Sequence, residues 1–151
     1  MKKLNYLYLL GLLLFAAVNF SACSDSDEPE SGSSSELIGL WEGVSIEGWF
    51  KYNGETVEFE DNHNDARLQF NSDGTCESYE YYSGSWELDS EGRWEYNKGK
   101  LSITYYDDEE GTTTDVGTVK ELTTSRLVVE SYDIDEEWEE SYALLTFKKI
   151  K

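Results

Sequence analysis

From about residue 39 to the end of the chain, apolar and polar residues alternate in short runs that turn-forming residues separate. Residues 49–52 and 55–59 are two such runs, and Asn53-Gly54 between them supplies the two positive-φ positions of a tight hairpin turn. Alternation of this kind places one face of a strand in a core and the other face in solvent. The pattern therefore predicts antiparallel β structure that begins with this hairpin.

Further alternating runs continue this pattern along the chain. They predict strands at residues 67–70, 75–82, 85–89, 93–96, 100–105, 112–122, 126–134 and 138–150, with turns at residues 71–74, 89–92, 97–99 and 123–125. Eight or nine short strands at regular spacing favour a meander, closed as a barrel or stacked as a sandwich. We therefore expect one all-β domain over residues 37–151.

An apolar run follows a short basic start at the N-terminus. Lys2 and Lys3 precede residues 4–20, which contain no charged residue. This run is slightly shorter than the ~20 apolar residues that a membrane-spanning helix needs, and the small residues Ser21 and Ala22 follow it. We interpret residues 1–22 as a secretion signal peptide, in preference to a retained transmembrane helix.

Cys23 directly follows Ser21-Ala22 at the end of the apolar run, and this position resembles the lipobox of bacterial lipoproteins. In that family the cysteine thiol takes a diacylglycerol and the signal is cleaved before the cysteine. Phe20 departs from the pattern, because Leu is commoner there. The resemblance implies lipid attachment at Cys23 and a membrane anchor. The alternative is a disulfide with Cys76, which we otherwise expect to be a buried small apolar residue.

Residues 23–36 begin with this cysteine and continue as an acidic, Ser-rich segment with the only proline of the chain. Residues 24–36 contain no apolar residue, so we expect a flexible tether. An acidic Ser-Asp run directly after the lipidated cysteine resembles the surface-export signal of Bacteroidetes lipoproteins. That resemblance implies an outer-membrane lipoprotein displayed at the cell surface, with a periplasm-facing position as the alternative.

A series of short motifs in residues 37–151 resembles the lipocalin-like domains of Bacteroidetes lipoproteins. Gly39-Leu40-Trp41 looks like the Gly-x-Trp signature at the start of the lipocalin barrel, where the Trp plugs the closed end. The later motifs are Phe70 with Asp73-Gly74-Thr75, then Gly84 to Trp86, then Leu122-Thr123. The resemblance implies a small antiparallel meander barrel of about eight strands, of the calycin type.

Two features depart from the lipocalin pattern. Lipocalins proper place an Arg on the last strand over the Trp, whereas this region has only Lys148, Lys149 and Lys151. Lipocalins also commonly carry disulfides, and a domain whose single cysteine is Cys76 cannot form one internally.

The resemblance also implies a binding module that holds one small apolar or amphipathic ligand in the mouth of the barrel. The candidate lining residues are aromatic or apolar: Trp49, Phe70, Trp86, Trp94, Ile103 and Tyr105. The alternative is a filled barrel whose outward tyrosines meet a glycan or a protein at the cell surface. Successive strand residues face opposite sides, so one ring each of Tyr81-Tyr82 and Tyr105-Tyr106 should point outward. We expect these rings to stabilise the sheet by cross-strand packing, with glycan or protein binding as the alternative.

The net charge of the chain limits the classes of molecule that it can bind. Lys and Arg number 12 against 32 Asp and Glu, which gives a net charge of −20. Nucleic acid needs a basic footprint, so it is excluded as a partner. The acidic surface also disfavours direct adhesion to anionic lipid. We expect a monomer without a cofactor.

The sequence predicts neither a catalytic nor a metal site, so we do not expect an enzyme. His63 is the only histidine, and its polar surroundings predict an exposed loop residue without a nucleophile-elbow motif nearby. The acidic runs at residues 107–110 and 133–140 lack the ligand spacing of a helix-loop-helix calcium site. We expect solvated charged loops there, with weak calcium binding as the alternative.

Overall fold

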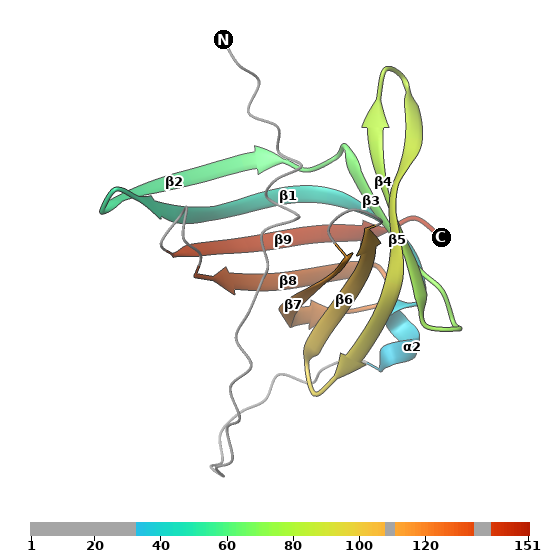
Figure 1. Cartoon of the computed structure of the whole chain (residues 1–151). Helices are drawn as coiled ribbons and strands as arrows, with labels where there is room; N and C mark the ends of the chain where they lie inside the picture. The colour runs from blue at the N-terminus through green and yellow to red at the C-terminus, as the bar shows by residue number, and fades with distance from the viewer. Residues whose placement is uncertain (1–32, 108–110, 135–139) are drawn as a thin grey trace.

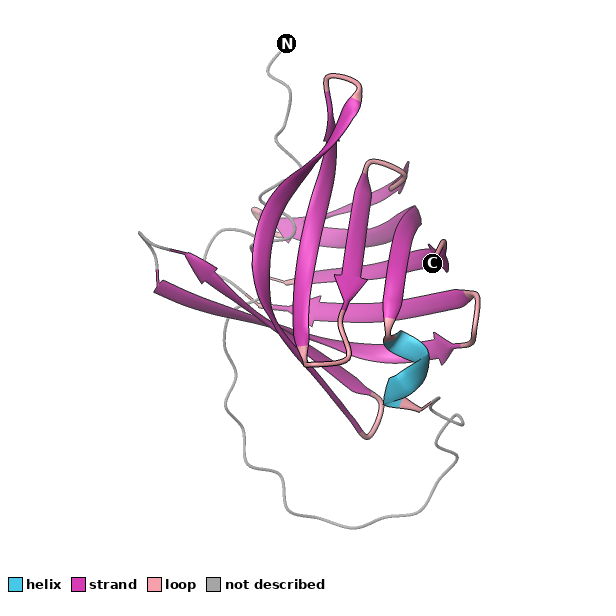
Figure 2. Ribbon diagram, turned by 90° about the vertical axis from the view of Figure 1, so that its right-hand side faces the viewer, coloured by secondary structure: helices cyan, strands magenta, loops and turns pink. Residues whose placement is uncertain are grey.

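The computed structural model describes residues 33–107, 111–134 and 140–151, and most of them lie in one antiparallel sheet (Figures 1 and 2). Its strands are β1 (Gly39–Tyr52), β2 (Glu55–Asn62), β3 (Ala66–Phe70), β4 (Thr75–Tyr82), β5 (Ser85–Asn97), β6 (Lys100–Asp107), β7 (Gly111–Leu122), β8 (Arg126–Asp133) and β9 (Ser141–Lys149). Neighbours pair in order from β3 to β9, and β1 pairs with both β3 and β9. Eight strands therefore close a barrel, which confirms the predicted meander barrel.

Strand β2 lies outside this closed ring. It pairs with the second half of β1, from Ser45 to Tyr52, while β3 pairs with the first four residues of β1. In the described residues, β2 has no other partner strand. The β1–β2 hairpin therefore projects from the barrel, away from the β4–β5 hairpin (Figure 1).

Most predicted strands appear where the alternation placed them. The Asn53-Gly54 hairpin is confirmed, since Tyr52 pairs with Glu55 and Asn53 has φ +52°. The predicted turn at residues 89–92 is wrong, because β5 runs through it. Gly92 lets β5 bend there, because a Cβ at this residue would lie 2.3 Å from the carbonyl oxygen of Thr104 on β6.

The short helix α2 (Ser34–Leu37) corrects the expectation of an unstructured tether up to residue 36. Ser33 caps it: the Ser33 side chain accepts from the N–H of Ser35, while the Glu36 carboxylate accepts from the N–H of Ser33. This is a capping box, which satisfies helix-end donors reciprocally. The proposed signal peptide (residues 1–22) and Cys23 lie outside the described residues, as does most of the tether.

Helix α2 closes one end of the barrel, which we call the closed end. The opposite end, where the β1–β2 and β4–β5 hairpins turn, is the mouth. The largest fully buried side chains are Trp41, Phe70, Leu37 and Leu127. Trp41 donates from Nε1 to the carbonyl oxygen of Leu37 at 2.7 Å, so the helix and the first strand are fixed to each other. Trp41 thus plugs the closed end, as the Gly39-Leu40-Trp41 motif predicted.

Within the described residues, no helix has the length and apolar character needed to cross a membrane.

Candidate functional site

The inner face of the barrel changes from apolar to polar between the closed end and the mouth. Near the closed end, Phe70 meets Trp94 edge to face, with ring centroids 5.6 Å apart. Ile103 follows on the same face, opposite Asp115 of β7, and Tyr105 lies opposite Thr113. Directly opposed residues share one face of a sheet. The interior wall therefore carries a carboxylate next to apolar and aromatic side chains.

Asp115 is the most unusual of these interior groups. Asp115 is only 7% exposed, and its Oδ1 atom has no hydrogen-bond partner in the described structure. Burial, together with the nearby Asp133 carboxylate, raises the pKa of Asp115 to about 7. A buried polar atom is expensive unless it is paired. Asp115 therefore needs a partner, and among the described residues the buried Tyr96 hydroxyl shares this lack of a hydrogen bond.

Asp133 lies level with Asp115 on the neighbouring strand. The β7–β8 register pairs Thr118 with Glu130, and continuing it places Asp133 opposite Asp115. Asp133 also pairs with Ser141 of β9. Two carboxylates on adjacent strands thus approach the same part of the interior.

A second group of acids lies on the β4–β5 side. Ser78 donates to Asp89 Oδ2 at 3.0 Å and lies 2.6 Å from the Ser90 hydroxyl. Partial burial and then the Asp89 charge raise the pKa of Glu80. Among the described strands, the inward-facing base is Lys149 at the closed end, opposite Trp41. The mouth half of the interior is therefore acidic.

The structure places four of the six predicted lining residues on the inner face: Phe70, Trp94, Ile103 and Tyr105. Their contact with a ligand remains a prediction. The other two, Trp49 and Trp86, face outward, which corrects their expected interior position.

Two β-bulges explain this correction. Trp41 and Trp49 would share a face in a regular strand, but Val44 is an extra residue between two register positions of β1. Asp89 is the corresponding extra residue of β5, between Trp94 and Trp86. One inserted residue moves all following side chains to the opposite face. Nothing in the alternation pattern revealed these insertions.

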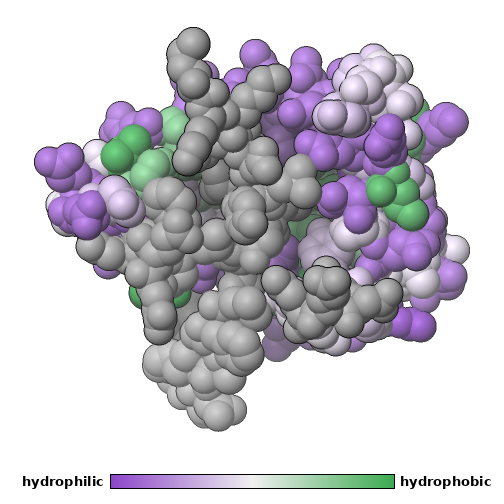
Figure 3. Space-filling model, turned by 45° about the horizontal axis from the view of Figure 1, so that its top comes forward, coloured by the Kyte–Doolittle hydropathy of each residue, from purple (hydrophilic) through white to green (hydrophobic). Residues whose placement is uncertain are grey.

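The displaced Trp49 forms an aromatic cluster on the outer face. Its ring stacks on Tyr142 with centroids 6.3 Å apart and meets Tyr132 edge to face at 6.4 Å. An open hollow of about 430 Å³ lies over this cluster, with Leu144 at its base and Glu47, Glu58 and Glu60 around it. In Figure 3 the coloured part of this face is mostly hydrophilic, with small apolar patches on the left, where β1 and β2 project, and on the right.

With this geometry in place, comparison with known proteins decides the family. A family model described as a lipocalin-like domain matches residues 37–129, more than half of the chain. The chain belongs to this lipocalin-like family. No curated protein matches it significantly.

Solved structures agree with the lipocalin-like fold. A lipocalin-like protein from Bacteroides uniformis aligns with a TM-score of 0.53 and 17% identity, over 76% of this chain and 99% of that chain. An uncharacterized protein from Bacteroides eggerthii aligns at a TM-score of 0.47 and 16% identity, over 76% and 99%. Bovine odorant-binding protein in complex with undecanal gives a TM-score of 0.41 and 21% identity, over 83% and 78%. The last two similarities add nothing to the fold assignment.

Lys149 stands over the plug of this lipocalin-like domain, where lipocalins proper place an Arg. Its Nζ atom lies 5.1 Å from the centroid of the Trp41 ring and donates to the carbonyl oxygen of Glu36 at 2.8 Å. A single ammonium group thus contacts both the plug and α2. The sequence predicted that the Arg of lipocalins is missing here. In the structure, Lys149 takes its place over Trp41.

His63 corrects another expectation. It lies between β2 and β3, but its side chain is only 14% exposed and contacts Phe147 edge to face at 5.9 Å. Burial lowers the pKa of His63, and the charges of Asp65 and Asp61 oppose that effect. His63 is therefore a packed interior residue of the domain and not an exposed loop histidine.

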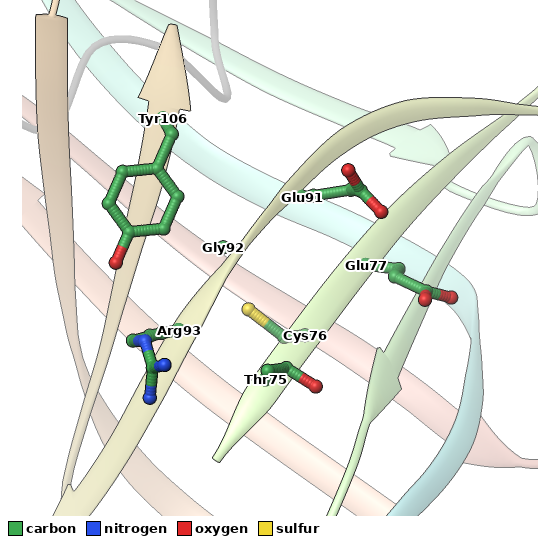
Figure 4. A pocket seen from close by; sticks show the side chains of 7 residues that line it. All are labelled: Thr75, Cys76, Glu77, Glu91, Gly92, Arg93 and Tyr106. Atoms are coloured by element: carbon green, nitrogen blue, oxygen red, sulfur yellow. The ribbon is translucent and has the colours of Figure 1, made fainter. Parts of the chain in front are cut away.

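A second open hollow, of about 310 Å³, lies where β5 bends at Gly92 (Figure 4). Glu77 and Glu91 point to one side of it, while Arg93 and Tyr106 lie on the other. Cys76 is a free, buried thiol, as predicted, and burial raises its pKa to about 11. Because the thiolate is the nucleophile, this cysteine is unreactive at neutral pH.

No group of three or more His, Cys, Asp or Glu side chains in the described residues could hold a metal ion. Residues 108–110 and 135–139, which make up most of the two acidic runs, lie outside those residues.

Proposed function

We propose that the mouth half of this barrel binds one small amphipathic ligand. The observation that carries the proposal is the buried, unpartnered Oδ1 atom of Asp115 beside the apolar wall of Ile103 and Tyr105. Native proteins rarely leave such an atom unpaired, so a ligand group is the natural partner. The interior of an eight-stranded barrel is either filled by side chains or holds one small ligand, as in lipocalins.

A pair of neighbouring tyrosines tests this proposal. Tyr105 faces the interior, whereas Tyr106 faces outward and is 59% exposed. The neutral fluorescent probe N-phenyl-1-naphthylamine should bind the chain from residue 23 onward, which keeps α2 and the whole barrel. Tyr105→Gln should weaken binding about tenfold, because it removes an aromatic contact.

Tyr106→Gln should leave the probe affinity unchanged, since this ring does not reach the interior. A wild-type protein that binds no probe, and whose native mass spectrum shows no co-purifying molecule, would end the small-ligand proposal. Equal losses in both variants would contradict an interior site.

We also propose that the chain is an outer-membrane lipoprotein, anchored by lipid on Cys23 and displayed at the cell surface. The lipobox-like position of Cys23 and the acidic run after it support this proposal. Metabolic labelling with an alkyne fatty acid should mark the wild type and not Cys23→Ser. Protease added to intact cells should remove the labelled protein's barrel domain, whereas a periplasm-facing protein would survive.

A second candidate function is glycan or protein binding on the outside of the barrel. The stacked Trp49 and Tyr142 rings in the outer hollow favour it, because exposed aromatic patches mark interaction sites. A glycan array probed with wild type and Trp49→Ala would test it. Binding that depends on Trp49 and is indifferent to Tyr105→Gln would favour this second function.

A further inference from the structure

We propose that the ligand of the barrel carries a protonated amine, which pairs with the carboxylate of Asp115. This inference rests on the proposed function, since it names the chemical class of the molecule that the interior would take. It is carried by the position of Asp115 on the inner face, by its missing partner and by the charges around it.

The position of Asp115 suits an ammonium group. Its side chain is more than nine-tenths buried, and Oδ1 has no hydrogen-bond partner in the described structure. An ammonium group has three donors and no acceptor, so it can satisfy carboxylate oxygens that a carbonyl or a second carboxylate cannot. The carboxylate of Asp133, level with Asp115 on β8, adds a second negative charge nearby.

The distribution of charge favours a cation over an anion. Glu80 of β4 adds an acidic group to the mouth half of the interior, and the more exposed Asp89 of β5 accepts from the buried Ser78 next to it. The inward-facing base among the described strands, Lys149, lies at the closed end and is engaged with Trp41 and Glu36. A cleft lined by one sign of charge concentrates ligands of the opposite sign. A fatty acid or another organic anion is therefore disfavoured.

The surrounding wall indicates an organic amine in preference to a metal ion. Asp115 is opposed by Ile103, and Tyr105 follows on the same face. Apolar and aromatic side chains can cover a hydrocarbon tail or ring but supply no metal ligands. The described residues contain no set of three ligating side chains, whereas calcium takes about six to eight oxygen ligands.

A matched series of probes tests the inference. Decylammonium, decanol and decanoate share one tail and differ in the charge of the head group. Each compound competes with N-phenyl-1-naphthylamine for binding to the chain from residue 23 onward at pH 7.5. Each is used below its own critical micelle concentration. Decylammonium should displace the probe at a concentration at least about tenfold lower than decanol, which is the factor expected for one charge-assisted hydrogen bond. Decanoate should be the weakest competitor.

Three variants test whether the preference for decylammonium depends on Asp115. Asp115→Asn should reduce the preference for decylammonium over decanol to about twofold or less, and Asp133→Asn should reduce it partly. Glu95→Gln removes an exposed acid from the outer side of β5 and should leave the preference intact. Circular dichroism and the affinity for the neutral probe report whether each variant retains the barrel.

The possible failures are distinguishable. If the neutral probe does not bind the wild type, the proposed function itself is wrong. If the probe binds but decanol and decylammonium compete equally, the amine inference is overturned and the ligand site stands. An amine preference that survives in both Asp115→Asn and Asp133→Asn would also overturn the inference, because it would place the ammonium group elsewhere.

Discussion

The closed end and the mouth of this barrel differ in their packing and in their buried charged groups. At the closed end, Trp41 donates to the carbonyl oxygen of Leu37, and Lys149 donates to that of Glu36. The buried hydroxyl of Tyr96 is the exception there, because it has no hydrogen-bond partner in the described structure. Toward the mouth, Asp115 is buried beside another acid with one oxygen unpaired. Among the described strands, β2 pairs with β1 alone, so its other edge has no partner strand there.

We infer from this contrast that the closed end determines the stability of the barrel and that the mouth determines ligand binding. Packed apolar side chains and the hydrogen bonds of Trp41 and Lys149 stabilise the closed end. The mouth retains groups that cost free energy, and proteins tolerate such local violations chiefly where they serve a function. The contrast is testable, because substitutions at the closed end should change stability, and substitutions at the mouth should change ligand binding and pH dependence.

The largest effect is expected from Trp41→Ala. This change empties the plug, which is fully buried, and leaves the carbonyl oxygen of Leu37 without its donor. Replacing a buried Trp by Ala costs about 3–5 kcal/mol. Urea unfolding followed by circular dichroism should show this loss. A loss below about 1 kcal/mol would mean that the closed end is not the stable part of the domain.

The next effect is a pH-dependent gain in stability from Asp115→Asn. The pKa of Asp115 rises from its ordinary 3.8 to about 7 in the folded protein, so the folded state holds a proton that the unfolded state releases. Wild-type stability should therefore fall as pH rises from 4 to 7. The variant lacks this fall and should be about 2–4 kcal/mol more stable than the wild type at pH 8.

At pH 3 the two proteins should have nearly equal stability, because Asp115 is then largely protonated in both the folded and the unfolded state. Tyr105 and Cys76 remain in both proteins, and burial raises the pKa of each above this pH range, so neither contributes to the difference. Parallel curves of unfolding free energy against pH for the two proteins would contradict the raised pKa.

The sequence predicted the architecture because alternation and turn residues are local signals. β4 has the predicted bounds, and β6 to β8 were found within two residues of theirs. The helical turn α2 was missed although Ser33 and Glu36 have the spacing of a capping box. The acidic composition of residues 24–36 outweighed that signal.

The interior was harder to predict, for two physical reasons. Bulges at Val44 and Asp89 reverse the facing of Trp49 and Trp86, and a one-residue insertion leaves no mark in the apolar pattern. Asp115, by contrast, could have been found. Asp115 and Val119 are four positions apart in β7, with no bulge between them. Because side chains alternate along a strand, the Asp115 carboxylate lies on the same core face as Val119.

His63 was missed because its burial is a tertiary effect. β2 and β3 both pair with β1, and the residues between them fold over Gly43, where a side chain would collide with the backbone of His63. Its ring then meets Phe147, which lies 84 positions later in the chain. No local pattern reports a contact of that kind.

A smaller effect tests the role of the base at the closed end. Lys149→Met removes the charge over the Trp41 ring and the donor to Glu36, and should cost about 1–2 kcal/mol. Lys149→Arg should restore most of the loss, because a guanidinium group also stacks on an aromatic ring. Thermal unfolding of the three proteins measures the difference.

Lys148→Met is the matched control, because Lys148 pairs with Glu42 at 2.8 Å on the outer face. An exposed ion pair contributes at most about 1 kcal/mol, so this variant should lose less than Lys149→Met. Equal losses in the two variants would show that the position over Trp41 has no special value.

The smallest expected effect concerns α2. Ser33→Ala removes the side-chain acceptor for the N–H of Ser35 and should cost about 0.5–1 kcal/mol. The change should also speed amide hydrogen exchange at Leu37 and Trp41, because the cap holds the helix against the plug. Ser34→Ala, within the helix, keeps the capping box and serves as the control. Binding of N-phenyl-1-naphthylamine should be the same in both variants, since the proposed site lies in the mouth half of the interior, away from α2. A change in probe affinity in Ser33→Ala alone would show that the two ends are coupled, and the separation of stability from function would then fail.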